Sequence, residues 1–478
     1  MTQPRRNEPC PCGSLRRYKD CHGRLAAEPA APDAQVRAAL AAHQRGDFEE
    51  AERAYREILA HDPVHAVATH YLGLVEWQRG DVAQAEARMR ASIAANASIP
   101  DFHNNLGLLL RDTQRADQAI ACFRAALAAN PAWFEAYNNL GLALEAAWRW
   151  DEAAEAYRAA IAHEPRFAAA RQNLARLLIR RGDFAAGRPE YRWRLFAQGL
   201  AAAPPDANAA PLPVALDGRS FALLGEQGIG DVLFFLRFAG ELVRRGARLA
   251  FRGDARLHSI IARTGLFALG TGTDNAPAPG LELVHIGDLP WLLGMTDAAH
   301  APPPLGLAPQ PERVARLNER LLALGARPWL ALTWRAGVAP TGPSRTQLKE
   351  VDSGALGAAL RGHRATWLSV QRLPRAGERE RLAAALDAPV HDFSDCNEDL
   401  EEMLALLSLV DGYVGVSNAN SHLRAGLVAP MHVLVAQPPE WRWGLDAPRS
   451  PWFPAAQVYR QSRDGDWGEA LRKLASDN

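Results

Sequence analysis

The chain has 478 residues, of which 48% are hydrophobic and 23% charged, so it is long enough for two or three globular units. Lys plus Arg and Asp plus Glu number 54 each, and this balance excludes an overall field that would attract a polyanion such as DNA. Neither a signal-peptide core nor an apolar stretch of about 18 residues is found. We therefore expect a cytoplasmic protein without a membrane span.

Cysteine and histidine cluster near the start of the sequence. Cys10, Cys12, Cys21 and His22 offer three thiolates and one imidazole, the ligand set of a closed structural zinc site. About twenty residues cannot bury a core, so bound Zn²⁺ would supply most of the folding free energy. The alternative is an unstructured tail with unpaired thiols.

The stretch RNEPCPCGSLRRYKDCHG resembles the SEC-C motif, with Leu15 where that family usually has glycine. The resemblance implies that residues 1–24 form a small zinc module that docks onto other molecules. Basic side chains outnumber acidic ones in this module. The implied partner is therefore an acidic protein or a ribosomal surface of the translation or secretion machinery.

Residues 32–198 repeat with a period of 34 residues. One repeated position holds Leu72, Leu106, Leu140 and Leu174, and glycine follows the first three of these leucines. The pattern resembles the tetratricopeptide repeat (TPR), whose small residues let the two helices of a unit approach closely. We predict an all-α TPR superhelix of about five units, at 32–65, 66–99, 100–133, 134–167 and from 168.

Asparagines recur on the first helices of the units, at Asn104, Asn105, Asn138, Asn139 and Asn173. In the TPR family these helices line a concave groove, where amides can bind the backbone of an extended peptide. A protein or peptide partner is therefore expected in the groove. The alternative is that the amides solvate the groove or bridge adjacent helices.

A linker rich in Ala and Pro, at 199–218, precedes a region of different character. Short apolar runs that end in glycine turns, such as FALLGEQGIGD, ARLAFRG and LELVHIG, alternate with helical stretches and predict a parallel α/β sheet. A proline-rich break divides the region into halves at 219–305 and 312–478, of which the second contains the strand WLALTW. Two α/β halves suggest a cleft between them.

The glycine loop after the first of these strands contains Gly228, Gly230 and Asp231. The stretch GIGDVLFFLRF resembles the loop that opens bacterial heptosyltransferases, enzymes of the GT-B fold with twin Rossmann-like domains. In that family the aspartate is the proposed general base, which would take the proton of an acceptor hydroxyl. Asp231 is equally suited to N-cap the helix that follows, and the two roles do not exclude each other.

The second half contains cations suited to a departing nucleotide diphosphate. TWRAG and SRTQLKEVDSGAL resemble the diphosphate-binding region of TPR-linked glycosyltransferases, including the protein O-GlcNAc transferases. The resemblance gives this role to Lys349, assisted by Arg335 or Arg345. Cations would offset the negative charge that gathers on the leaving group. No acidic D-x-D motif stands out, so we expect no catalytic metal.

A second phosphate-binding element is expected further along. LSLVDGYVGVSNANSHLRAGL resembles the heptosyltransferase element D-T-x-x-x-H, which lies against the nucleotide phosphates. His422 matches, whereas Ser417 and Asn418 stand where the family has Asp and Thr. Backbone amides at the helix start, around Asn420, would still bind phosphate. We expect the tryptophans of the later stretch PPEWRWGLD to pack the domain rather than to line the cleft.

Together the resemblances imply a multidomain protein of a kind found in bacteria. The TPR superhelix would present an acceptor protein, and the GT-B region would transfer a sugar to it from a nucleotide-sugar. The rival interpretation is an adaptor whose enzyme half has degenerated, in which the zinc motif and the repeats hold protein partners together.

Overall fold

A computed structural model describes residues 34–199, 201, 205, 210–226, 228–274, 279–295, 297–298, 301–336, 349–445 and 448–477. The predicted zinc ligands Cys10, Cys12, Cys21 and His22, and also Arg345, lie outside this range. Contacts divide the chain into two compact units, described separately below: Met1–Leu177 with Trp193–Pro205 and Pro340–Arg345, and Leu178–Arg192 with Asp206–Ala339 and Thr346–Asn478. Within the described residues, no helix has both the length and the apolar character needed to cross a bilayer.

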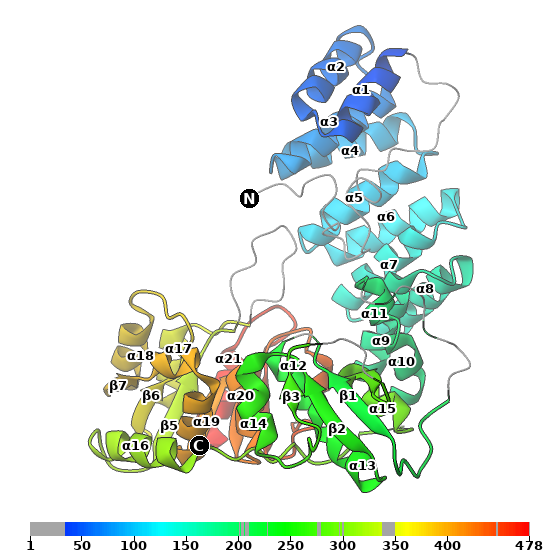
Figure 1. Cartoon of the computed structure of the whole chain (residues 1–478). Coiled ribbons are helices and arrows are strands. Elements are labelled where there is room, and N and C mark those ends of the chain that lie inside the picture. The colour runs from blue at the N-terminus through cyan, green and yellow to red at the C-terminus, as the bar shows by residue number, and fades with distance from the viewer. Residues whose placement is uncertain are drawn as a thin grey trace. The chain divides into compact units, whose positions relative to one another are not determined.

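Residues 34–163 of the first unit form an all-helical array of helix pairs, which follow one another in a stack (Figure 1). Each predicted repeat contains one pair, so the TPR superhelix is confirmed. The helices are α1 (Ala34–Arg45), α2 (Phe48–His61), α3 (Ala66–Gln78), α4 (Val82–Ala95), α5 (Pro100–Asp112), α6 (Ala116–Ala129), α7 (Phe134–Ala146), α8 (Trp150–His163), α9 (Ala168–Arg180), α10 (Phe184–Tyr191) and α11 (Arg194–Ala197).

The turn inside each repeat places one residue in the left-handed region of backbone space. Gly46, Gly80 and Gly182 fill this position in three repeats, with φ of 88°, 92° and 87°. The third and fourth repeats put Gln114 and Trp148 there, with φ of 64° and 61°. A side chain costs about 1 kcal/mol in this conformation. These two repeats therefore carry local backbone strain.

Gln114→Gly should relieve this strain and raise the free energy of unfolding by roughly 0.5 kcal/mol, because glycine's larger unfolded-state entropy offsets part of the gain. Urea denaturation measures the difference. Gln84→Gly is the matched control, since this residue lies inside α4 and glycine there should destabilise the array by about 1 kcal/mol. A loss of stability in both variants would contradict the strain at position 114.

The repeated asparagines are buried and bridge neighbouring first helices. Asn139 Nδ2 donates to Asn104 Oδ1 at 3.1 Å, and Asn173 Nδ2 donates to Asn138 Oδ1 at 2.8 Å. Asn105 Nδ2 lies 3.0 Å from His70 Nε2. These amides hold successive repeats together. The structure therefore favours the bridging alternative over a peptide contact for this set.

Two buried histidines should make the array sensitive to acid. His70 stacks on Phe102 with a centroid separation of 4.2 Å, and burial lowers the pKa of His70 to about 3 and that of His43 to about 4. A lowered histidine pKa means that the unfolded chain binds more protons below pH 6.5, so stability present at pH 7 is lost as the pH falls.

We expect the free energy of unfolding to drop between pH 6.5 and pH 5 by up to about 1.4 kcal/mol per pH unit for each of these histidines. Urea denaturation at several pH values measures the slope. In His70→Gln, which removes one titrating group, the slope should be shallower. An equal slope in the two proteins would contradict the assignment.

The second unit contains two parallel sheets, as the apolar runs predicted. The first has the strand order β3-β2-β1-β4 and holds the three strands predicted in 219–305 together with the short β3, which the sequence did not reveal. Its elements are β1 (Ser220–Leu224), α12 (Ile229–Phe235), η2 (Leu236–Phe238), α13 (Ala239–Arg244), β2 (Arg248–Arg252), η3 (Ala255–Leu257), α14 (His258–Ala262), β3 (Thr271–Gly272), β4 (Glu282–His285), η4 (Ile286–Asp288) and α15 (Leu289–Leu292).

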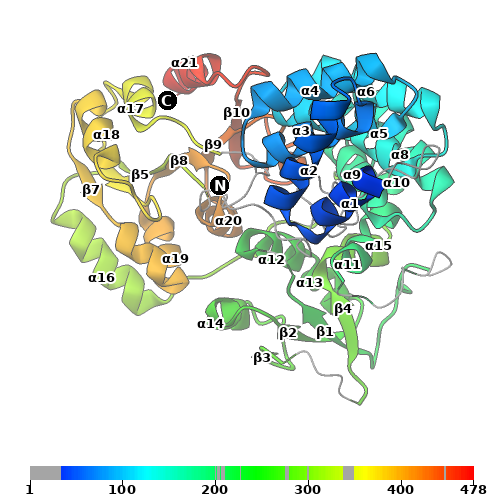
Figure 2. The same ribbon diagram turned by 90° about the horizontal axis from the view of Figure 1, so that it is seen from above.

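The second sheet has the order β10-β9-β8-β5-β6-β7, again parallel throughout. Figure 2 shows α17, α18 and α21 on one side of it and α16, α19 and α20 on the other. Its elements are α16 (Pro311–Leu322), β5 (Trp329–Thr333), α17 (Ser353–Leu360), β6 (Thr366–Ser369), α18 (Glu378–Leu386), β7 (Val390–Asp392), η5 (Ser394–Glu398), α19 (Leu400–Leu409), β8 (Gly412–Val416), α20 (Ala419–Gly426), β9 (Met431–Val435), η6 (Trp441–Trp443), β10 (Ala456–Arg460) and α21 (Gly468–Asp477).

Both sheets reverse their strand order beside a central strand. In the first sheet the chain moves outward from β1 to β2 and β3 and then returns to place β4 on the other side of β1. In the second it moves from β5 to β6 and β7 and returns to place β8 beside β5. In open α/β sheets, ligands bind outside the carboxyl ends of the strands at such a reversal. Each sheet therefore has one strand-order reversal at which this rule predicts a ligand site.

Candidate functional site

The carboxyl ends of the two sheets come together inside the second unit through two helices. Helix α12 follows the central strand of the first sheet, and helix α20 follows β8 in the second; these two helices pack against each other. The approach is close at Gly230, where a Cβ atom would lie 2.5 Å from Cδ2 of His422. Only glycine leaves room for this contact. The structure thus brings the predicted Gly230–Asp231 loop and the predicted phosphate element into one site.

Asp231 lies in the first turn of α12, where the positive end of the helix favours a carboxylate. The N-cap residue is Gly228, not Asp231, so the capping role considered from the sequence is not the one observed. Arg442 Nη1 donates to Asp231 Oδ1 at 2.6 Å. Burial raises the pKa of Asp231 above its usual range, although the Arg442 charge opposes the rise.

A second carboxylate, Glu440, forms the centre of the site, and the sequence interpretation missed it. Lys349 Nζ donates to Glu440 Oε1 at 2.6 Å, and Ser417 Oγ donates to Glu440 Oε2 at 2.6 Å. Burial by itself raises the pKa of Glu440, but Arg442 and Lys349 outweigh it and the pKa falls to about 2. Glu440 therefore stays ionised, whereas Asp231 is the weaker acid of the pair.

The sequence held only a weak signal for Glu440. It is the one acidic residue in the stretch PPEWRW, between prolines and tryptophans that favour burial. Arg442 belongs to the same stretch and is 7% exposed. Arg442 pairs with Asp231, which lies in the other sheet domain of the unit. The local sequence around either residue does not predict this contact.

Arg335 does not join this cluster. Its Nη2 donates to Glu378 Oε2 at 3.1 Å and to the Leu373 carbonyl at 2.9 Å, so its charge is neutralised by a neighbouring carboxylate. Of the two predicted diphosphate cations that the structure describes, Lys349 is the one that reaches the Ser417 loop, through the carboxylate of Glu440.

The loop before α20 is held by its own side chains. Asn418 caps the helix: its Oδ1 accepts from the Ser421 amide at 3.1 Å, and its Nδ2 donates to Thr333 Oγ1 at 3.3 Å. Asn420 Nδ2 donates to Asn397 Oδ1 at 3.1 Å. Both predicted binding residues thus have structural partners in the described state.

His422 is buried, 5% exposed, between Gly230 and an aromatic cluster. Burial, reinforced by the charge of Arg442, lowers the pKa of His422 to about 3. The imidazole is therefore neutral at physiological pH. It packs against Phe453 with a centroid separation of 5.5 Å. A charge contact from His422 to phosphate is not expected in this state.

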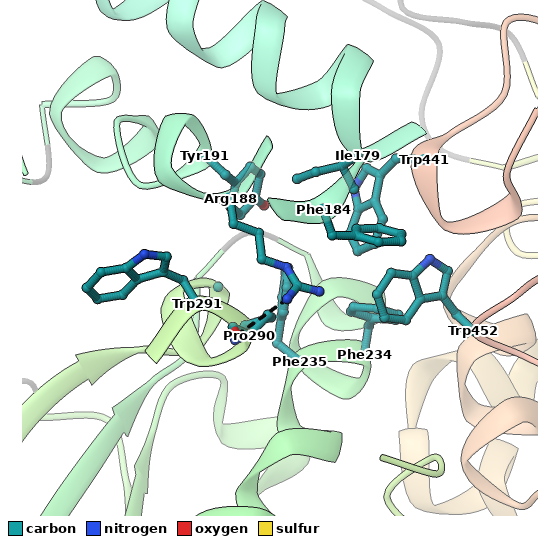
Figure 3. Close-up of a pocket in the computed structure, with 11 residues that line it drawn as sticks. Ile179, Phe184, Arg188, Tyr191, Phe234, Phe235, Pro290, Trp291, Trp441 and Trp452 are labelled. Atoms are coloured by element: carbon teal, nitrogen blue, oxygen red, sulfur yellow. Dashed lines mark hydrogen bonds between the residues drawn. The ribbon is translucent and has the colours of Figure 1, made fainter. Parts of the chain in front are cut away.

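Aromatic side chains fill the space next to Asp231 and Arg442. Trp441 and Trp452 pack edge to face on Phe234, with centroid separations of 4.9 and 5.2 Å. Figure 3 shows Arg188 among these rings, with its guanidinium directed at the Pro290 carbonyl, 3.5 Å away. The cavity that they line measures about 20 Å³, enough for one water molecule. Packing, as predicted for Trp441, is their role here.

The chain was compared with known proteins. A sequence profile of the SEC-C motif matches residues 6–24. Profiles of the tetratricopeptide repeat match 24–66, 70–132, 104–162 and 138–207. No curated protein matches the chain.

Among solved structures, a crystal structure of MamA is 23% identical and covers 34% of this chain and 95% of its own, with a TM-score of 0.32. MamA from Desulfovibrio magneticus RS-1, from residue 41 onward, is 20% identical, covers 36% of this chain and 100% of its own, and has a TM-score of 0.33. Pseudomonas aeruginosa PilF is 21% identical, covers 45% of this chain and 84% of its own, and has a TM-score of 0.35. The chain therefore carries a SEC-C motif followed by an array of tetratricopeptide repeats.

Proposed function

We propose that the second unit is a glycosyltransferase of the GT-B type, which transfers a sugar from a nucleotide-sugar to a hydroxyl of a protein bound by the TPR array. The observation that carries the proposal is the meeting of two strand-order reversals at Asp231 and the Ser417 loop. Twin sheets that face each other at such reversals suit a donor in one half and an acceptor in the other.

In the proposed reaction, Asp231 takes the proton of the acceptor hydroxyl while the hydroxyl oxygen bonds to the anomeric carbon of the donor. The bond between that carbon and the diphosphate oxygen breaks, and the nucleoside diphosphate leaves with the electron pair. Lys349 and the backbone amides at the start of α20 would stabilise its charge. The raised pKa of Asp231 makes its carboxylate a better proton acceptor than a solvent-exposed one.

The SEC-C motif would supply a structural Zn²⁺ site formed by Cys10, Cys12, Cys21 and His22. A reducing cytoplasm would keep these thiols available for the metal. The zinc content of the purified protein, compared with that of Cys10→Ser, tests this part separately. A ratio of one zinc per chain that falls in the variant supports the site.

The transferase proposal is tested with the full chain and a panel of UDP, GDP, ADP and CMP sugars. Binding is followed by thermal shift, and turnover by release of the free nucleotide. A donor that stabilises the protein and is slowly hydrolysed supports the proposal. If no donor does either, the transferase proposal is wrong.

A second candidate is a protein-binding adaptor that has lost the chemistry, and a specific observation favours it. Arg335, Lys349 and Arg442 are each paired with a carboxylate of the chain itself. If partners are recovered through residues 1–198 while every nucleotide-sugar fails to bind, the adaptor is the better description.

A further inference from the structure

The carboxylate of Glu440 sits where donors from separate segments converge. Lys349 follows β5 in the chain, Ser417 follows β8, and Trp443 belongs to η6; each contributes a donor, the last through Nε1 at 3.3 Å from Glu440 Oε2. Arg442 Nη2 lies 3.9 Å from Oε1. An ammonium, a guanidinium, a hydroxyl and an indole N–H around one anionic group are a donor set that also suits a phosphate.

The position of this group matches the crevice that the topology marks. Ser417 directly follows β8, which lies beside β5 at the reversal of strand order in the second sheet. The site is also open to solvent on one side, because 24% of the Glu440 side chain and 26% of the Lys349 side chain are exposed. Solvent therefore reaches the ion pair that holds this carboxylate.

A carboxylate and a phosphate cannot share these donors, because two anions at hydrogen-bonding distance repel each other. We propose that Glu440 is an internal substitute for the diphosphate of the donor. Its carboxylate occupies the anion site until a phosphorylated ligand displaces it. The inference rests on the proposed function and deepens it, since it names the group that competes with ligands for the same site. Glu440 thereby lowers the affinity for every phosphorylated ligand by competing for Lys349 and Ser417.

The test measures binding of inorganic pyrophosphate to the full chain by titration calorimetry. Glu440→Gln removes the competing charge and keeps a side chain of equal size, so we expect pyrophosphate to bind at least about tenfold more tightly than to the wild type. Glu350→Gln is the matched control, because Glu350 is the neighbour of Lys349 in sequence but pairs with Arg375. It should bind pyrophosphate as the wild type does.

Glu440→Asp provides a milder variant in case the glutamine protein does not fold. Its shorter side chain cannot reach Lys349 and Ser417 together, so pyrophosphate affinity should lie between those of the other two proteins. Unchanged or weaker pyrophosphate binding in both Glu440 variants would overturn the inference, and so would a complete absence of binding in all proteins.

The outcomes separate the inference from the function it rests on. Suppose that pyrophosphate binds more tightly to Glu440→Gln but that no variant binds a nucleotide-sugar. This result would support the role of Glu440 as an internal anion and would contradict the transferase proposal. Suppose instead that the wild type binds and turns over a nucleotide-sugar, while the Glu440 variants bind pyrophosphate no more tightly than it does. This result would support the transferase proposal and overturn the role of Glu440 as an internal anion.

Discussion

Asp231→Asn should lower the rate of sugar transfer by a factor of about 10² to 10⁴, the usual contribution of a general base. An amide cannot accept the proton of the acceptor hydroxyl, but it keeps the size of the side chain. The wild-type rate should also fall as the pH drops through the raised pKa of Asp231, because only the ionised carboxylate acts as a base. The acidic limb of the pH profile should be absent in the variant.

Turnover of the best donor from the nucleotide-sugar panel measures this effect. Asp254→Asn is a suitable control, because Asp254 lies in the same sheet domain and its carboxylate caps η3 and pairs with Arg256. Arg442 loses its hydrogen-bonded carboxylate in Asp231→Asn, so a thermal melt must show that the variant is folded. A folded variant that keeps its rate within threefold would show that Asp231 is not the base.

Gly141→Val should destabilise the TPR array by about 3 kcal/mol, at the upper end of the cost of overpacking. Even a single Cβ atom at this position would run into the ring of Tyr157, which packs on the glycine within the same repeat. The same arrangement recurs one repeat earlier, where a Cβ on Gly107 would lie 2.8 Å from the Phe123 ring. Urea denaturation of the full chain measures the loss.

Two comparisons isolate the steric cause. Ala146→Val places the same β-branched side chain at an exposed position of α7 and should cost only the difference in helix propensity, well under 1 kcal/mol. In a Tyr157→Leu background, the penalty for Gly141→Val should shrink, because the ring that blocks the new side chain is gone. Equal penalties in the two backgrounds would rule out the clash.

How much the sequence predicts differs between the two units, for a physical reason. In a repeat array each helix pair packs on its neighbours, so the spacing of small and large residues along the chain is also the spacing of contacts in space. The period therefore located the helix pairs from α1–α2 to α9–α10. The left-handed turn residues recur with the same period. The strain at Gln114 and Trp148, however, is evident only from their backbone angles.

In the α/β unit, the apolar runs predicted β1, β2, β4 and β5, and the glycine loop identified Asp231 as a residue of interest. What surrounds Asp231 comes from far along the chain. Arg442 is more than 200 residues away in sequence, and Glu440 reaches Lys349 across some 90 residues. Charges separated in this way meet because α12 of the first sheet domain packs against α20 of the second. The sequence by itself determined the repeats, the motif and four of the strands; the tertiary structure decided which charges neutralise one another, because ion pairing depends on distance in space.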